Sequence, residues 1–303
     1  MKADRLDLRR YRDTIAVADG GWSTQLRARG LPPRVLPETA NLTHAALVAS
    51  LAREYLAAGA CFLTTNTFAA NRYVFKQRGV KHDPLEVARA GAKIARKAVG
   101  DSGALVVGSI GPSGKLLAVR EASEEQLSAV FAEQAGALAE GGVDAIVLET
   151  FSELAEIVLA IRAVKSAVPL LVIASLSFDS GPQHTRTIMG AEAGECAAAV
   201  QDAGADAAGC NCGAGIDTVL PAVVALRANC ELPLWVKPSA GVPELVEGEL
   251  VYPVTPEQFD DYVPALLEAG ANIIGGCCGV GPEHIRRVAA LVAARLRKPP
   301  RKR

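Results

Sequence analysis

The sequence predicts an α/β protein built as a single (β/α)8 TIM barrel, with its active site at the C-terminal rim of the strands. Two observations lead to this fold class. Eight short apolar segments alternate with eight longer amphipathic segments, which is typical of right-handed βαβ units around a parallel sheet. A weak repeat also marks the start of every second strand, as described below. A chain of 303 residues suits one closed barrel of eight units, and a doubly wound open sheet is the alternative.

The expected strands are the short apolar segments: 14–21, 61–68, 105–111, 145–151, 170–178, 205–212, 232–238 and 272–278. The expected helices lie between them, over residues 43–58, 84–99, 123–141, 152–167, 191–203, 217–228, 256–269 and 282–296. Several helices carry recognisable N-terminal signals. Ser123 precedes Gln126 by three positions, as in a capping box, and Pro84, Pro256 and Pro282 stand at first-turn positions.

The connections differ between the two ends of the barrel. Four helices end in similar three-residue sequences just before a strand, at 58–60, 141–143, 203–205 and 269–271. Each contains a glycine suited to a left-handed C-cap. Four connections after strands are instead long and rich in Gly, Pro and polar residues: 22–41, 112–122, 179–190 and 239–255. Long loops follow the strands, so we expect the functional rim at the C-terminal strand ends.

Composition limits the class of protein. The net charge of -1 favours neither nucleic acid nor an acidic membrane surface as a partner. Seven cysteines, an odd number, argue against a secreted disulfide framework, and the N-terminus has no apolar signal segment. No apolar stretch approaches the roughly 18 residues of a membrane span. We therefore expect a cytoplasmic protein of one domain, residues 1–303, with the barrel over 13–297 and a solvated basic tail over 298–303.

The cysteines carry the chemistry. Cys277 and Cys278 lie between glycines directly after the last apolar segment, and neighbouring side chains reach one metal ion only if the backbone turns there. Cys212 ends the sixth strand, one strand away from the eighth in a closed barrel. We therefore expect these three sulfurs to face one point at the mouth. Cys210 has the same facing but lies about 7 Å deeper and is expected in the core, while Cys61, Cys196 and Cys230 belong to another rim or layer.

Three thiolates with an open fourth position are typical of a catalytic zinc site. A thiol substrate could bind in that position and would be held as the thiolate, which is the nucleophile. Zinc-activated water for hydrolysis is the weaker reading, because three anionic sulfurs make the metal a poorer Lewis acid than His ligands do. The alternative without a metal is a set of buried or oxidised thiols. His44, His82, His184 and His284 are expected on the surface.

The sequence resembles the homocysteine S-methyltransferase family over nearly the whole chain, from Asp19 to Val292. The most specific match is the cysteine doublet in its glycines together with Asn211-Cys212. Four further segments match the family less specifically: 18–21, 64–68, 108–112 and 148–150. The resemblance implies a (β/α)8 barrel that binds Zn2+ through three cysteines, here Cys212, Cys277 and Cys278, and transfers a methyl group to the zinc-bound sulfur of homocysteine, giving methionine.

The resemblance also implies roles for residues around the thiols. The acidic residues that hold the substrate amino group correspond to Asp19 and Glu149, and a carboxylate could be received by the backbone amides of Gly20 and Gly21. The alternatives are a turn-forming Asp19 and a Glu149 paired with an arginine. Asn66 and Asn211 are candidates for orienting ligands or substrate.

The methyl donor stays open between a quaternary amine such as betaine, a sulfonium and a methylated corrinoid. The segments 111–115, 185–190 and 237–243 are similar to the homocysteine module of cobalamin-dependent methionine synthase. The chain ends with the barrel, so we expect the donor to come from solution or from a partner such as a corrinoid protein. Homo-oligomerisation is left open. An aromatic box for betaine would draw on Trp22, Phe68, Tyr73, Phe151, Phe178 and Tyr252.

Two other functions remain as alternatives. One is a homocysteine- and zinc-binding subunit without its own donor, working with a separate corrinoid or folate protein. The other is a different barrel enzyme, such as an aldolase or isomerase, for which Lys237 alone would be the reactive group.

Overall fold

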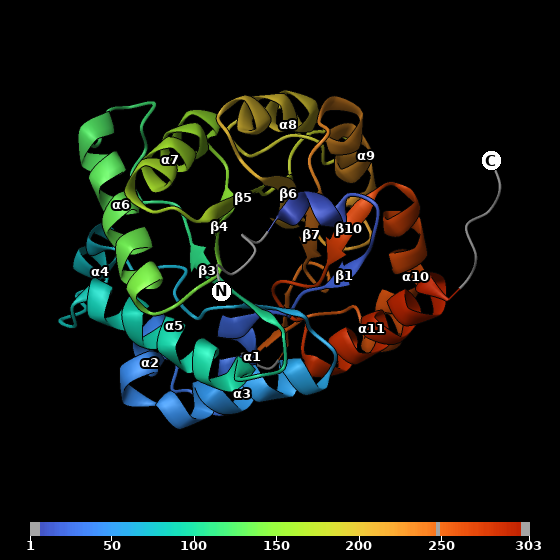
Figure 1. Cartoon of the computed structure of the whole chain (residues 1–303), viewed down its shortest axis with the longest axis horizontal. Helices are drawn as coiled ribbons and strands as arrows, with labels where there is room; N and C mark the ends of the chain where they lie inside the picture. The colour runs from blue at the N-terminus through green and yellow to red at the C-terminus, as the bar shows by residue number, and fades with distance from the viewer. Residues whose placement is uncertain (1–6, 247–248, 298–303) are drawn as a thin grey trace, which may run out of the picture.

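The computed structural model describes residues 7–246 and 249–297. Eight parallel strands form one sheet that curls into a barrel, and eight main helices surround it (Figure 1). The barrel strands are β1 (Ala16–Val17), β2 (Phe62–Thr64), β3 (Leu105–Ile110), β4 (Ala145–Phe151), β5 (Leu171–Leu176), β6 (Ala207–Cys212), β7 (Leu234–Pro238) and β10 (Ala271–Ile274). The predicted (β/α)8 barrel is confirmed.

Strand order shows how the barrel closes. Each strand pairs with the next one along the chain, and β10 lies between β7 and β1. The last seam, between β1 and β2, is a parallel bridge from Ala18 to Phe62, and the Asp19 amide donates to the Phe62 carbonyl at 3.0 Å. The short seam brings the end of β1 beside the end of β2, which places Asp19 at the mouth.

The surrounding helices follow the predicted segments closely. They are α3 (Ala45–Ala57), α5 (Pro84–Val99), α6 (Glu124–Glu140), α7 (Leu154–Ala167), α8 (Ala193–Asp202), α9 (Leu220–Asn229), α10 (Pro256–Glu268) and α11 (Pro282–Leu296). Capping boxes at Ser123 and Thr255 start α6 and α10. The four repeat glycines, Gly59, Gly142, Gly204 and Gly270, all have φ between 90° and 102°, which explains why glycine recurs before every second strand.

The barrel interior has an apolar floor and a polar top. Side chains such as Phe62, Val107, Val147 and Trp235 fill the inner cluster. Because strand residues two apart share a face, the next inward positions on these strands lie one layer higher. Those positions are Thr64, Ser109, Glu149 and Lys237, and the site is built from this layer.

Several short elements lie where loops were predicted. The 22–41 connection contains α1 (Trp22–Ala28), η2 (Pro37–Thr39) and the start of α2 (Ala40–Thr43), and 239–255 contains a hairpin of β8 (Glu244–Val246) and β9 (Glu249–Val251). A 3-10 helix, η1 (Leu8–Tyr11), precedes β1, and α4 (Arg72–Gln77) follows β2. The sequence did not predict these short elements. Such short elements have weak periodicity and depend on tertiary contacts.

Three strands end four residues earlier than predicted. The strands predicted over 14–21, 61–68 and 272–278 end at Val17, Thr64 and Ile274. After Ile274 the amides of Gly275 and Gly276 donate to Val236 on one side and to Asp19 on the other. The cysteine doublet therefore lies in a turn after the strand. Adjacent cysteines need such a turn if both are to bind one metal ion. The basic tail predicted for 298–303 lies outside the described residues. Within the described residues, no helix is long and apolar enough to cross a lipid bilayer.

Candidate active site

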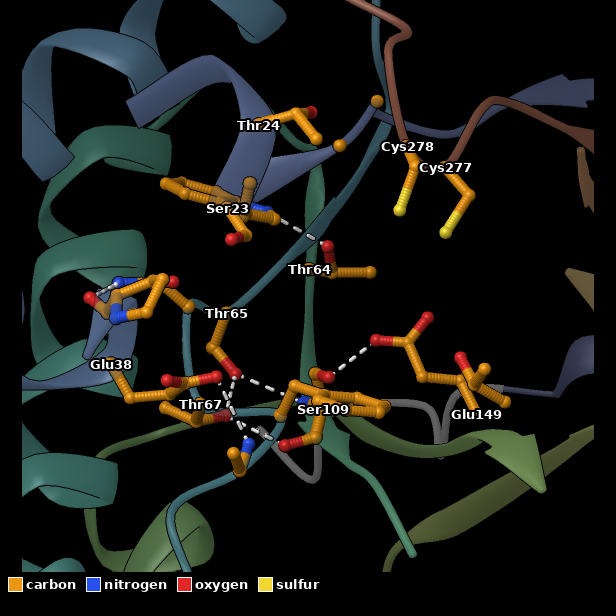
Figure 2. Close-up of a pocket in the computed structure, with 18 of the residues that line it drawn as sticks. Ser23, Thr24, Glu38, Thr64, Thr65, Thr67, Ser109, Glu149, Cys277 and Cys278 are labelled. Atoms are coloured by element: carbon orange, nitrogen blue, oxygen red, sulfur yellow. Dashed lines mark hydrogen bonds between the residues drawn. The ribbon is translucent and has the colours of Figure 1, made fainter. Parts of the chain in front are cut away.

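A cavity of about 370 Å³ opens at the C-terminal ends of the strands. Its walls come from the ends of β2, β3, β4, β6 and β7 and from the loops after β1, β2 and β10 (Figure 2). Its polar lining includes Thr64, Ser109, Glu149, Lys237, Cys212, Cys277 and Cys278. The cavity therefore lies at the rim that loop length indicated.

The three thiols meet at one side of this cavity. The Cys212 sulfur lies 3.0 Å from the Cys277 sulfur and 3.7 Å from the Cys278 sulfur. All three lie within 4.8 Å of one another and are free thiols. Figure 2 shows Cys277 and Cys278 directed to the same side. Residues 65 positions apart in the chain thus present sulfur to one point.

Backbone conformation brings Cys212 into this group. Cys210 packs in the outer layer between the strands and the helices, so regular alternation would turn Cys212 outward as well. Cys212 instead has φ +59°, in the left-handed region that residues with a side chain rarely adopt. Cys210 is a core thiol, as predicted. The prediction that it shares the facing of Cys212 is wrong, because Cys212 itself adopts this left-handed conformation.

The thiol group fits a tetrahedral metal. Zinc–sulfur bonds of about 2.3 Å place two thiolates about 3.8 Å apart, close to the 3.7 Å between Cys212 and Cys278. The 3.0 Å contact would have to widen by about 0.8 Å on metal binding. A tetrahedral ion held by these three cysteines, which all line the cavity, would have one position left for a further ligand. These residues could therefore hold a soft metal ion with room for one more sulfur.

The thiols also share their protons unequally. Hydrogen bonds from Cys212 and then from Cys277 lower the pKa of Cys278 to about 3. Hydrogen bonds to Cys277 and Cys278, together with burial, raise the pKa of Cys212 well above its usual value. The three thiols therefore lose one proton readily and resist losing a second. A cation bound between them would favour loss of the remaining protons.

Glu149 stands at the end of β4 and faces the cavity. Ser109, on β3, donates a hydrogen bond to one of its carboxylate oxygens. Burial raises the pKa of Glu149 to about 7, against the lowering effect of Lys237. The alternative pairing with an arginine is not found in the described residues, where the neighbouring cation is a lysine. Glu149 is thus positioned to accept a hydrogen bond from a ligand.

Asp19 lies behind the cavity wall and is fully buried. Its Oδ2 accepts hydrogen bonds from Trp22 Nε1 at 3.0 Å, and from the Thr64 amide and hydroxyl at 2.8 Å each. Its Oδ1 pairs with Lys237 Nζ at 2.5 Å. The carboxylate is saturated by protein donors, so this geometry does not support the expected direct contact with a substrate ammonium.

The two glycines after Asp19 are needed for close packing. A Cβ on Gly20 would lie 2.3 Å from the Val280 carbonyl oxygen, and one on Gly21 would lie 2.4 Å from the Cys277 carbonyl oxygen. The Gly21 amide donates to the Val280 carbonyl at 2.9 Å. The Gly21 amide is therefore unavailable to a substrate carboxylate. Of the two predicted carboxylate donors, only the Gly20 amide is left.

The two asparagines form hydrogen bonds with residues around the cavity. Asn211 accepts from the Thr150 amide at 2.8 Å and from Ser175 at 2.7 Å, and its amide nitrogen lies 3.8 Å from the Cys277 sulfur. Asn66 lines the cavity but donates to the Pro37 carbonyl at 2.7 Å. Asn211 thus orients a thiol, whereas Asn66 fixes the loop after β1.

Comparison with known proteins identifies the group to which the chain is related. Residues 16–292 match the family model described as homocysteine S-methyltransferase. The chain belongs to the homocysteine S-methyltransferase family.

Individual members of the family differ in length. Methionine synthase of Mycobacterium tuberculosis is 30% identical over 98% of this chain, and that of Mycobacterium leprae is 30% identical over 92%. This chain spans about a quarter of their length, 26% and 24%. The metallated homocysteine methyltransferase MmuM from Escherichia coli superposes with a TM-score of 0.76 at 26% identity, covering 92% of this chain and 97% of that one. Its oxidized form gives 0.75 at 27% identity.

Some site features escaped prediction from the sequence. Lys237 reaches the cavity because it lies two residues after the inward Trp235 on β7, and Ser109 lies two after Val107 on β3. Strand parity could have found both. His284, predicted on the surface, is buried: the Gly281 amide donates to its Nδ1 at 3.2 Å, and its Nε2 lies 3.3 Å from the Val254 carbonyl.

The expected aromatic residues are dispersed. Trp22 and Phe68 line the cavity, but the Trp22 indole N–H is used by Asp19 and Thr64. Phe151 and Phe178 are buried in the outer core. No aromatic box surrounds the cavity formed by the described residues.

Proposed function

We propose that this barrel transfers a methyl group to the sulfur of homocysteine, giving methionine, with Zn2+ held by Cys212, Cys277 and Cys278. The observation that carries the proposal is the meeting of three thiols, from two strand ends, at the wall of a cavity that also presents Glu149 and Lys237. Family membership and the likeness to a homocysteine methyltransferase of nearly the same length support it. The barrel, over residues 13–297, would act as one homocysteine-binding domain.

When bound, zinc would hold the substrate sulfur as a thiolate at neutral pH. In the transfer, the sulfur lone pair forms the new S–C bond while the bond from the methyl carbon to its donor atom breaks, and that electron pair leaves with the donor. The protein residues orient the acceptor: Asn211 holds Cys277, and Glu149, fixed by Ser109, accepts a hydrogen bond from the amino acid portion. Positioning of this kind supplies much of the rate enhancement in a displacement reaction.

A panel of donors tests the proposal. The zinc-loaded chain would be incubated with homocysteine and betaine, S-methylmethionine, S-adenosylmethionine or methylcobalamin, and methionine would be measured. Methionine formation with one of them is expected, together with about one zinc per chain. Full activity in protein stripped of metal would contradict the zinc proposal, and absence of product with every donor would favour the second candidate.

The second candidate is a homocysteine-binding subunit that receives its methyl group from a separate corrinoid or folate protein. One observation favours it. Among the described residues, nine of the twelve exposed large apolar side chains lie on three connections at the functional rim, where a partner could cover them: Leu116, Val119, Ile188, Met189, Val242, Leu245, Val246, Leu250 and Val251. Product formation only after a methylated corrinoid protein is added would identify this function.

A further inference from the structure

Lys237 is the only cationic side chain among the described residues that line the cavity. It is 3% exposed and lies at the end of β7, with its ammonium 5.5 Å from the centre of the Trp235 ring. An ammonium group donates three hydrogen bonds. Within the described part of the chain, Nζ has one acceptor, Asp19 Oδ1 at 2.5 Å. Lys237 therefore keeps donor capacity for a ligand in the cavity.

Asp19 fixes this ammonium in place. Its four protein donors come from α1, β2 and β7, so the carboxylate cannot turn toward the cavity without losing several of them. Asp19 is absent from the cavity wall, whereas Lys237 forms part of it. A ligand approaching this wall thus meets a cation. An ammonium group would be repelled there, and a carboxylate would be attracted.

Glu149 provides the opposite charge in the same cavity. Ser109 donates to one oxygen of its carboxylate, and Figure 2 shows the other oxygen turned toward the side where Cys277 and Cys278 lie. Lys237 and Glu149 both line this cavity of about 370 Å³, so one small ligand can reach both groups. The ammonium and the carboxylate of an amino acid are attached to one carbon, so they need a hydrogen-bond acceptor and a hydrogen-bond donor in the same cavity.

We propose that Lys237 binds the carboxylate of the thiol substrate and so completes recognition of an α-amino acid zwitterion, whose ammonium the resemblance to the family already assigns to Glu149. Asp19 is then a positioning residue that acts through Lys237 and does not touch the substrate. The inference rests on the proposed function, because it assumes that an amino acid thiol enters this cavity. It adds the specificity determinant that the thiol group by itself does not provide.

Three thiols distinguish the two charged contacts. They are homocysteine, 4-mercaptobutanoate, which lacks the ammonium, and 3-aminopropane-1-thiol, which lacks the carboxylate. Binding of each to the zinc-loaded protein would be measured by titration calorimetry under reducing conditions. Lys237→Gln alone would leave Asp19 buried without its cation and endanger folding. The test therefore uses the double variant Asp19→Asn/Lys237→Gln, checked for native circular dichroism and zinc content, beside Glu149→Gln.

The double variant should bind homocysteine and 4-mercaptobutanoate about 10- to 100-fold more weakly than the wild type, as expected for loss of a charge-assisted hydrogen bond. Its affinity for 3-aminopropane-1-thiol should change less than about threefold. Glu149→Gln should show the reverse pattern, losing the aminothiol and keeping 4-mercaptobutanoate. A merely structural role for Lys237 would weaken all three thiols equally or none of them, and either result overturns the proposal.

The proposed function fails separately. If the wild type binds homocysteine with this charge selectivity but yields no methionine with any donor or corrinoid protein, methyl transfer is wrong and the assignment of Lys237 stands. If it yields methionine and the double variant keeps wild-type selectivity, the assignment of Lys237 alone is wrong. If the wild type binds none of the three thiols, both are overturned.

Discussion

Lys237 Nζ lies 2.5 Å from Asp19 Oδ1, and both side chains are almost completely buried although 218 positions separate them in the chain. The pair joins the ends of β7 and β1, the two strands on either side of β10, which leads into the cysteine doublet. Because Asp19 accepts three further hydrogen bonds, the cost of removing both charges from water is offset locally. The ion pair thus links the two strands on either side of the turn that contains Cys277 and Cys278, and it stabilises that turn.

Removing one partner of this pair should destabilise the protein more than removing both. Asp19→Asn leaves Lys237 as a buried cation without an anion, which we expect to lower the free energy of unfolding by about 3–5 kcal/mol. Asp19→Asn/Lys237→Gln should lose at least about 1 kcal/mol less, since no unpaired charge remains. Urea denaturation measures both. Equal losses in the single and double variants would show that the ion pair has no such energetic coupling.

Loss of one thiol should abolish metal binding and methyl transfer together. Cys278→Ser replaces a soft ligand with a hydroxyl that does not ionise at neutral pH, so zinc content and methionine formation should fall by at least about tenfold. Cys61→Ser is the matched control, because Cys61 is exposed at the opposite rim. Zinc by mass spectrometry and product formation are the readouts. A Cys278→Ser protein with full zinc and full activity would refute the ligand set.

His284 should make the fold sensitive to mild acid. Burial lowers the pKa of His284 below its usual 6.5, so the folded state favours the neutral ring, whose Nδ1 accepts from the Gly281 amide. This stabilisation is complete above pH 6.5 and is lost as pH falls through the folded-state pKa. Between pH 7.5 and 5.0 the free energy of unfolding of the wild type should therefore fall more than that of His284→Gln. Parallel losses in chemical denaturation would count against this assignment.

Gly209 should be essential for packing of the barrel interior. A Cβ at this position would lie 1.9 Å from the Trp235 carbonyl oxygen, a backbone atom that cannot yield easily. Gly209→Ala should therefore destabilise the protein by at least about 1–3 kcal/mol. Gly136→Ala, within α6, should stabilise it by about 0.5–1 kcal/mol, because the new Cβ would have no atom within 4 Å apart from its chain neighbours and the nearby backbone of its own helix. Thermal melts compare the two, and the same sign for both would contradict the packing argument.

The sequence by itself determined the barrel and the order of its elements. The bounds of β4, α5 and α11 agree with prediction, because each combines a clear period with a proline or an uninterrupted apolar run. Barrel order also led to the expectation that Cys212 and the late doublet meet, since it depends only on where parallel strands end. The direction of the Cys212 side chain came instead from its left-handed backbone conformation.

Tertiary structure decided the charges around that point. The sequence contains Asp19, Glu149 and Lys237 as three isolated residues, and the resemblance to the family implied that both acids bind a substrate ammonium. Only the closure of β1 against β2 and the placement of β7 beside β10 bring Lys237 to Asp19 and leave Glu149 facing the cavity. A buried charge selects its partner by distance in space, and residues 218 positions apart carry no local signal of that distance.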